Sequence, residues 1–223
     1  MTVKLIVTED GSHTLKAEGL QEHYHSTFGA INESRHVFVE AGLLRVLENE
    51  APAISILEVG FGTGLNALLT LLEKKSAGVE INYLAIEAYP LLEETWTRLN
   101  YADLLGEEST KTIFGRLHSS KWNEPEQILP GFILEKRNSK LESFTADESF
   151  DLVYFDAFSP EVQPELWTEG IFRNIYSMTK PGGILVTYSC KGSVKRALKA
   201  AGFDIEKLPG PKGKREMLRG VKI

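Results

Sequence analysis

Short apolar segments alternate with segments of helical periodicity from residue 53 to the end of the chain. Apolar residues three and four positions apart, such as Leu65, Leu68, Leu69 and Leu72, mark the helical segments. A helix is expected from Leu65, and others at 90–100, 166–178 and 194–201. Strands are expected at 55–59, 81–87, 132–136, 150–158 and 184–189. Such alternation predicts a doubly wound α/β sheet, paired in parallel through right-handed crossovers.

The apolar pattern closes with two strands, 203–208 and 215–222, joined by a short loop rich in Pro and Gly. A short loop suits an antiparallel hairpin and is too short for a crossover. Pro181, Gly182 and Gly183 predict a turn before the strand that precedes this pair. The expected fold is therefore a Rossmann-like sheet, mostly parallel, with an antiparallel last strand.

The first 52 residues have a different pattern. Segments 3–8 and 13–19 predict a β-hairpin, a polar loop with several aromatic residues follows, and 37–47 predicts a helix. We expect residues 1–52 to form an N-terminal extension that covers the active site, and residues 53–223 to form the main domain.

Residues 57–66, LEVGFGTGLN, join the first strand of the main domain to its first helix. Gly60, Gly62 and Gly64 let the backbone turn sharply and approach a ligand closely. In a doubly wound sheet, ligands bind beyond the carboxyl ends of the strands, where this loop is expected. The third glycine comes one residue too early for a dinucleotide fingerprint, and no phosphate loop of the GxxxxGK[ST] type occurs. The loop instead resembles the first motif of S-adenosylmethionine-dependent methyltransferases.

Two acidic residues strengthen this interpretation of the loop. Glu58, just before the glycines, suits a ligand with a positively charged amino-acid end. Glu87 ends the second strand, where a carboxylate can accept hydrogen bonds from both hydroxyls of a ribose. S-adenosylmethionine carries both groups and is the expected cofactor, with a purely structural glycine turn as the alternative.

A second candidate site is DAFSP, residues 156–160, at the end of the fourth core strand. Amine methyltransferases often carry an acid or amide, a small residue and an aromatic residue in this place. Asp156 can hold an amine, orient it and take or relay its proton, and Phe158 can stack on a base or form a wall of the pocket. The alternatives are a helix-capping or buried acid for Asp156 and a core residue for Phe158.

Several segments resemble, in order and spacing, the methyltransferase domain of the bifunctional tRNA 5-methylaminomethyl-2-thiouridine biosynthesis proteins, the MnmC family. They cover nearly the whole chain and include YHS (24–26), NESRHVF (32–38), GFGTGLN (60–66), IEAYP (86–90), DAFSPEVQPELWT (156–168), the segment 179–203 and GKREML (213–218). The resemblance implies methyl transfer from S-adenosylmethionine to the exocyclic amine of 5-aminomethyl-2-thiouridine at the wobble position of tRNA.

In the bifunctional proteins a flavin-dependent oxidoreductase domain makes the aminomethyl substrate. No second glycine fingerprint occurs in these 223 residues, so we expect the stand-alone form, without flavin or metal. A separate FAD-dependent oxidoreductase or an upstream tRNA-modifying enzyme is then the expected partner.

The resemblance also implies roles for individual residues. Asp156 and Phe158 match the catalytic positions that hold the amine and pack on the base. The positions that match the cofactor pocket are Tyr24, His25, Ser26, Glu58, Gly60, Gly62, Gly64, Asn66, Glu87 and Ala88. His25 is a proton relay, an orienting group or a structural residue. The family's acid for the adenine amine has no counterpart here, so adenine is expected to be held by Asn138 or by backbone groups.

The net charge of −6 is distributed unevenly along the chain. From Lys180 onward there are eleven Lys and Arg against three Asp and Glu, whereas the other 179 residues carry −14. A basic section on an acidic body suggests one face that binds a polyanion; a solvated surface is the alternative. The expected contacts to tRNA phosphates are Lys191, Lys195, Arg196, Lys212, Lys214 and Arg215.

Composition fits a globular domain, with 42% hydrophobic and 25% charged residues. Cys190 is the sole cysteine and is expected to be a small buried residue; with no secretory signal at the N-terminus, a cytoplasmic location is expected. The apolar run 53–72 contains Glu58 and three glycines and so fits a strand, loop and helix better than a membrane span. Two functional alternatives remain, a polyamine aminopropyltransferase and a non-catalytic tRNA-binding module.

Overall fold

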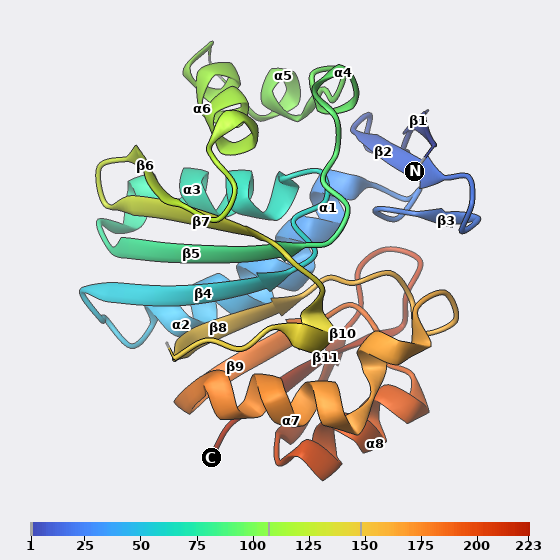
Figure 1. Ribbon diagram of the computed structural model, residues 1–223, viewed down its shortest axis with the longest axis vertical. Coiled ribbons are helices and arrows are strands. Elements are labelled where there is room, and N and C mark those ends of the chain that lie inside the picture. The colour runs from blue at the N-terminus through green and yellow to red at the C-terminus, as the bar shows by residue number, and fades with distance from the viewer. Residues whose placement is uncertain (1, 107, 148) are drawn as a thin grey trace.

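A computed structural model describes residues 2–106, 108–147 and 149–223, which form a twisted sheet with helices on both faces (Figure 1). The sheet has eight strands. Their order across the sheet is β10 (Asp204–Pro209), β11 (Glu216–Val221), β9 (Thr179–Thr187), β8 (Phe150–Phe155), β4 (Ala53–Val59), β5 (Glu80–Glu87), β7 (Phe132–Asn138) and β6 (Pro125–Leu129).

The expected topology is confirmed. β9, β8, β4, β5 and β7 pair in parallel, and β11 lies between β9 and β10, antiparallel to both. From β4 the chain first adds β5 and β7 on one side and then β8 and β9 on the other, and the parallel pairing brings the carboxyl ends of β4, β5 and β8 to one edge. This edge is the switch point at which doubly wound sheets bind ligands.

Helices cover the two faces because neighbouring strand residues point in opposite directions. On β4, for example, Ile56 packs into the hydrophobic cluster of one face and Leu57 into that of the other. The first face is covered by α1 (Ala30–Ser34), the π-helix η1 (Arg35–Leu43), α2 (Leu44–Leu47), α3 (Leu65–Ala77) and α6 (Glu108–Ser119). The second is covered by η2 (Leu141–Ser143), η3 (Pro164–Trp167), α7 (Glu169–Met178) and α8 (Gly192–Ala201).

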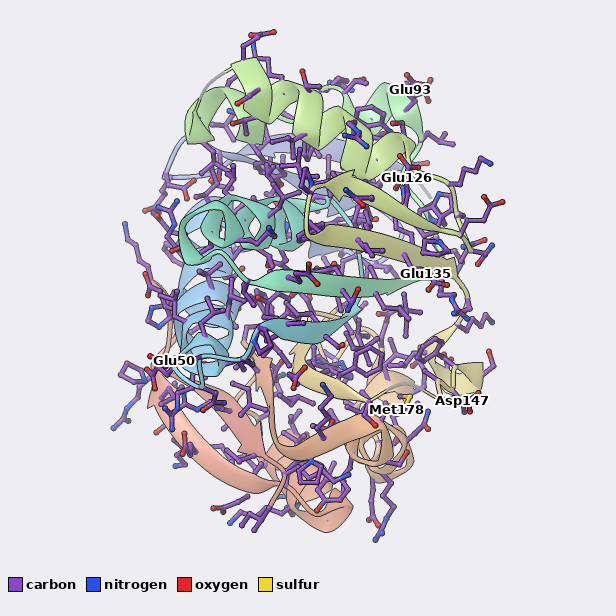
Figure 2. All side chains as sticks on the ribbon, turned by 90° about the vertical axis from the view of Figure 1, so that its left-hand side faces the viewer. Glu50, Glu93, Glu126, Glu135, Asp147 and Met178 are labelled. Carbon is purple, nitrogen blue, oxygen red and sulfur yellow. The ribbon has the colours of Figure 1, made fainter. Side chains whose placement is uncertain are left out.

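The end of α7 is anchored to the segment before β8. Figure 2 shows Met178 beside Asp147, and the Ala146 N–H donates to the Met178 sulfur at 3.3 Å. Met178 also packs into the second hydrophobic cluster, so the end of α7 contacts both the core and the segment that leads to β8.

The N-terminal hairpin is confirmed as β1 (Val3–Val7) and β2 (His13–Ala17), and β3 (Glu22–His23) extends it to three strands. This small sheet lies at the right of the main sheet in Figure 1. The helix expected at 37–47 begins earlier, at Ala30, and its middle is a π-helix. Since η1 packs on β8 and β9, this part of the extension belongs to the same core as the main sheet.

The prediction of a helix at 90–100 is wrong. Only a short α4 (Glu93–Trp96) forms there, and α5 (Tyr101–Leu105) begins after Asn100. Two tertiary contacts oppose a continuous helix: Trp96 stacks on His118 with centroids 4.7 Å apart, and Asn100 clasps the N-terminal hairpin.

The sequence analysis did not foresee α6 and β6. α6 is mostly polar, with Ile113, Phe114 and Leu117 buried, and β6 alternates weakly between exposed and buried residues. The turn expected at Pro181–Gly183 is a bulge within β9, where Gly182 has φ +77° and the register with β8 shifts. No helix in the described ranges is long and apolar enough to cross a membrane.

The Asn100 clasp yields a test of how the hairpin is held. Its Oδ1 accepts the His13 N–H at 2.8 Å and its Nδ2 donates to the Gly11 carbonyl at 2.9 Å. Asn100→Ala removes both bonds and should lower the free energy of unfolding by about 1–3 kcal/mol, with faster amide exchange in the hairpin. Asn49→Ala is the control, because Asn49 is exposed and its side chain makes no hydrogen bond to a described residue. Equal exchange rates in the two variants would contradict this role of Asn100.

Candidate active site

A cavity of about 640 Å³ opens at the carboxyl ends of β4, β5 and β8, with residues 22–27 of the extension along its wall. Its size and position fit a nucleotide-sized ligand at the switch point. The residues expected at the site that line it are Tyr24, His25, Ser26, Gly60, Gly62, Asn66, Glu87, Ala88, Asp156, Phe158, Lys191 and Lys214.

The glycine loop after β4 lies too close to the end of β8 and to Tyr24 for its glycines to carry side chains. Gly60, Gly62 and Gly64 have φ of +89°, +48° and +71°, a region that other residues rarely adopt. A Cβ at Gly60 would lie 2.7 Å from the Asp156 carbonyl oxygen, and one at Gly62 would lie 3.2 Å from the Tyr24 ring. Gly64 does not line the cavity; it is the left-handed residue from which α3 begins.

Two histidines are hydrogen-bonded to Thr63 of this loop. His118, which the sequence analysis missed, donates to the Thr63 carbonyl at 3.0 Å, and His25 is hydrogen-bonded to the Thr63 hydroxyl at 2.7 Å. Burial lowers the pKa of His118 to about 3 and that of His25 to about 4, so both rings are neutral near pH 7. The geometry of His25 therefore supports the orienting role among the three expected for it.

Glu87 is held at the cavity wall by backbone donors. Its carboxylate accepts the Gly62 N–H at 3.0 Å and the Tyr89 N–H at 2.8 Å. Burial raises the pKa of Glu87 while these backbone bonds lower it. Each carboxylate oxygen keeps a lone pair, and so the group can accept two further hydrogen bonds from a vicinal diol.

Glu58 is not at the cavity, contrary to the expectation that it meets the ligand directly. Its side chain is fully buried in β4, and it does not line the pocket. Asn66, at the start of α3, does line the pocket, and its Nδ2 donates to Asp156 at 2.8 Å. Glu58 lies outside the cavity because side chains alternate along a strand, and that of Glu58 points toward the face of the sheet that α3 covers.

Asp156 follows β8, and its backbone N–H donates to the Val59 carbonyl at 3.0 Å, beside the glycine loop. Burial raises the pKa of its carboxyl group to about 7, against the opposing effect of the Asn66 hydrogen bond. The charge of Glu33 raises this pKa further, and that of Lys214 lowers it. Asp156 is thus a carboxyl group that can exchange a proton near neutral pH.

Aromatic rings flank the acid. Tyr24 and Phe158 meet edge to face with centroids 5.0 Å apart, and both line the cavity. The Trp167 indole donates to the Phe158 carbonyl at 2.8 Å, which fixes the loop after β8. Ser26, the last residue of the YHS segment, donates its backbone N–H to Glu33 at 2.7 Å.

Asn138 does not reach the cavity, which corrects the expectation that it contacts adenine. Its Nδ2 donates to the carbonyls of Glu87 and Ala88 at 2.9 and 3.4 Å, and this clasps the turn after β5. Ser139, Lys140 and Leu141 line the pocket in its place. The periodicity of β7 carried no signal for this one-residue difference.

The expected basic face is largely neutralised. Four of its lysines form ion pairs: Lys191 with Glu161, Lys195 with Glu216, Lys212 with Glu9 and Lys214 with Glu33. Arg196 and Arg215 are exposed and form no ion pair within the part of the chain that the structure describes.

Lys214 is a pocket residue, although the sequence placed it on the phosphate-binding face. Its Nζ lies 2.6 Å from the buried Glu33 carboxylate and 3.9 Å from the centre of the Tyr188 ring. Glu33 and Tyr188 also line the cavity, and the sequence analysis missed both. In the described ranges, no three His, Cys, Asp or Glu residues cluster as metal ligands. Cys190 is a half-buried free thiol beside the second hydrophobic cluster.

The sequence of this chain is similar to those of known methyltransferases. Residues 133–223 match the model of a family described as S-adenosyl-L-methionine-dependent methyltransferase. The tRNA 5-methylaminomethyl-2-thiouridine biosynthesis bifunctional protein MnmC of Aeromonas hydrophila is 31% identical over 88% of this chain and 32% of its own length. The chain thus spans about a third of that relative.

Solved structures agree with the sequence comparison. MnmC2 from Aquifex aeolicus superposes with a TM-score of 0.79 at 27% identity, over 98% of this chain and 70% of that one. Spermidine synthase from Thermotoga maritima, at 13% identity and a TM-score of 0.59 over 99% of this chain and 68% of that one, shares the fold alone. The chain is therefore an S-adenosylmethionine-dependent methyltransferase, related to the methyltransferase portion of the MnmC proteins.

Proposed function

We propose that this protein transfers a methyl group from S-adenosylmethionine to the primary amine of 5-aminomethyl-2-thiouridine at the wobble position of tRNA. The observation that carries the proposal is the half-buried Asp156 carboxyl group, which is bonded to Asn66 in a cavity that the glycine loop and two aromatic rings also line. The names of the relatives support the choice of acceptor, because MnmC proteins are named for the biosynthesis of 5-methylaminomethyl-2-thiouridine in tRNA.

The chain's own residues fit the cofactor. Gly60 and Gly62 leave room where a Cβ would clash, and the fixed carboxylate of Glu87 suits a ribose diol. When bound, S-adenosylmethionine supplies an electrophilic methyl group on a positively charged sulfur. Ser139, whose buried hydroxyl has no hydrogen-bond partner among the described residues, lines the same cavity on the β7 side.

Asp156 handles the proton of the acceptor amine. A primary amine is mostly protonated near neutral pH and has no free lone pair in that form. A carboxylate at this position binds the ammonium group, orients it and accepts the proton that must leave before the nitrogen attacks. The raised pKa of Asp156, about 7, suits this exchange, because it lies closer to the pKa of an amine than that of an ordinary carboxyl group does.

Tyr24 and Phe158 suit a flipped-out nucleobase. Single-stranded RNA bases are bound by stacking on aromatic side chains, and a wobble base lies in the single-stranded anticodon loop. The edge-to-face pair leaves aromatic surface along the cavity. Most of the rate enhancement then comes from positioning the amine and excluding water.

A polyamine aminopropyltransferase is less well supported. Such an enzyme binds a polycation, and acids do line this cavity, but Glu33 and Glu161 are already paired with Lys214 and Lys191. The relatives, moreover, are named for the biosynthesis of a modified uridine in tRNA. A non-catalytic tRNA-binding module would need neither a glycine loop shaped for a ligand nor a half-buried acid beside it. The proposal also includes the cytoplasm as the place of reaction and a separate FAD-dependent oxidoreductase, or another upstream tRNA-modifying enzyme, as the source of the aminomethyl group.

The proposal is tested by methyl transfer from labelled S-adenosylmethionine to tRNA that carries 5-aminomethyl-2-thiouridine, with mass spectrometry of the nucleosides. The methylaminomethyl nucleoside should form with the wild type, and Asp156→Asn should lower kcat by about 10²–10⁴-fold. Calorimetry should show S-adenosylmethionine binding in both proteins.

Asp147→Asn is the matched control, because Asp147 is exposed and does not line the cavity. Putrescine with the decarboxylated donor tests the polyamine alternative. Aminopropyl transfer to putrescine, or undiminished methyl transfer in Asp156→Asn, would overturn the assignment.

The pH profile tests the electrostatics around Asp156. Protonated Asp156 cannot take up the ammonium proton, so kcat/KM should fall as the pH drops below about 7, the pKa to which burial raises the group. Lys214→Met removes a positive charge that lowers this pKa and leaves Glu33 unpaired, which moves the acidic limb to higher pH. Lys212→Met, which removes a surface pair with Glu9, should leave the limb where it is. A shift of equal size in both variants would contradict the local effect.

The salt dependence of tRNA binding tests which cations contact phosphate. Arg196→Ala and Arg215→Ala should each reduce the slope of log K against log salt by about 0.7–0.9, since both guanidinium groups are exposed and unpaired within the described ranges. Lys212→Ala should change the slope less, because its charge is already paired with Glu9. The same slope for all three variants and the wild type would exclude this surface from the tRNA interface.

A further inference from the structure

Three buried polar groups lie together beneath the active site without hydrogen-bond partners among the described residues. They are both carboxyl oxygens of Glu58, Oδ1 of Asn66 and the hydroxyl of Tyr83. Asn66 and Tyr83 are near enough to Glu58 for hydrogen bonding to act on its carboxyl group, although no bond of standard geometry is formed. Buried polar groups are nearly always satisfied, so a set of mutual partners left open calls for an explanation.

Glu58 has no countercharge among the residues that the structure describes. It is fully buried on β4, and the charged groups that act on it, Asp156 and Glu87, are acids like itself. An unpaired carboxylate in such surroundings is far less stable than the neutral acid. Burial first, and then these two acids, raise the pKa of Glu58 well above its usual range.

A neutral carboxyl group resolves the open hydrogen bonds. It has one O–H donor and one carbonyl acceptor, whereas a carboxylate only accepts. The O–H can donate to Asn66 Oδ1, and the carbonyl can accept from the Tyr83 hydroxyl. An ionised Glu58 would instead attract the NH2 group of Asn66, which would turn that group away from Asp156.

The opposite end of the Asn66 amide bonds to the proposed catalytic acid. Its Nδ2 donates to Asp156 Oδ2 at 2.8 Å. Because the oxygen and the NH2 group lie on opposite sides of the amide, holding the oxygen toward Glu58 holds the NH2 group toward Asp156. We propose that Glu58 acts as a neutral acid that fixes the orientation of Asn66, and through it Asp156, and that it is not a ligand of the cofactor.

Glu58 is thus a positioning residue, and Tyr83 holds its far side. The inference rests on the proposed function only in making Asp156 the group that receives the amine. Several other titratable groups act on Asp156 and Glu58, and these residues must be left unsubstituted when the titration of the two acids is measured. These groups are Glu33, Glu87, Tyr83, Tyr101, Tyr154, Tyr188 and Lys214.

The test follows the side-chain carboxyl carbons of ¹³C-labelled protein by NMR, with Asp156→Asn and Glu58→Gln used to assign the two signals. Glu58 should stay protonated throughout the pH range in which Asp156 titrates, around its pKa of about 7. Glu58→Gln should leave the pKa of Asp156 unchanged and S-adenosylmethionine affinity within about twofold, because an amide supplies the same donor and acceptor.

Asn66→Ala removes the hydrogen bond to the carboxylate and should raise the pKa of Asp156 by about one unit. Glu58→Met should raise it by part of that amount, since Asn66 is then free to turn. The double variant should match Asn66→Ala alone, because both changes act through one bond. Tyr83→Phe, which removes only the far partner, gives a further variant of nearly unchanged volume.

Three results would each overturn the inference. These are a Glu58 signal that titrates in this range, a tenfold loss of cofactor affinity in Glu58→Gln, or an unchanged Asp156 pKa in Glu58→Met. The titration needs no tRNA and no turnover. If the wild type failed to methylate the proposed tRNA while these pKa changes appeared, the proposed acceptor would fall and the role of Glu58 would stand.

Discussion

The pairing of β4 with β8 is the constraint on which the active site depends. It brings the glycine loop and Asp156, nearly a hundred residues apart in the sequence, within one hydrogen bond of each other, from the Asp156 N–H to the Val59 carbonyl at 3.0 Å. A Cβ at Gly60 would lie 2.7 Å from the carbonyl oxygen of Asp156. Glycine is therefore needed here for the close approach of β4 to the end of β8, as well as to leave room for a ligand. The cofactor cradle and the proposed proton acceptor are thereby held in fixed register.

Burial then sets the chemistry of the acids around this contact. Asp156, Glu58 and Glu87 lie close together at or below the cavity, and burial raises the pKa of all three. Their partners separate their roles: Glu87 has two backbone donors, Asp156 has one amide donor, and Glu58 has none of standard geometry. Although their environments are similar, Glu87 is a fixed hydrogen-bond acceptor, Asp156 titrates near pH 7, and Glu58 is proposed to be a neutral acid.

One wall of the cavity is built from the two ends of the chain. Lys214, in the loop between β10 and β11, pairs with Glu33 of α1, and Gly213 packs so closely on the Phe28 ring that a side chain at this position would clash. Residues almost the whole length of the chain apart therefore close one wall. This arrangement explains why a lysine in a basic segment lies inside the pocket, where its charge acts on Asp156 and not on a solvent-exposed phosphate.

Local sequence patterns were enough to predict the strand and helix alternation, the antiparallel end of the sheet, the glycine loop and the acids at two strand ends. These follow from periodicity and from backbone freedom, which are local properties. The other features depend on contacts between segments that are distant in the sequence. The contacts of Asn100 and Trp96 ended a helix that its local pattern favoured, a one-residue register put Asn138 outside the pocket, and strand alternation turned Glu58 away from it. Charge partners such as Glu33 for Lys214 arise from distant segments, and no local pattern encodes which cations the folded chain leaves unpaired.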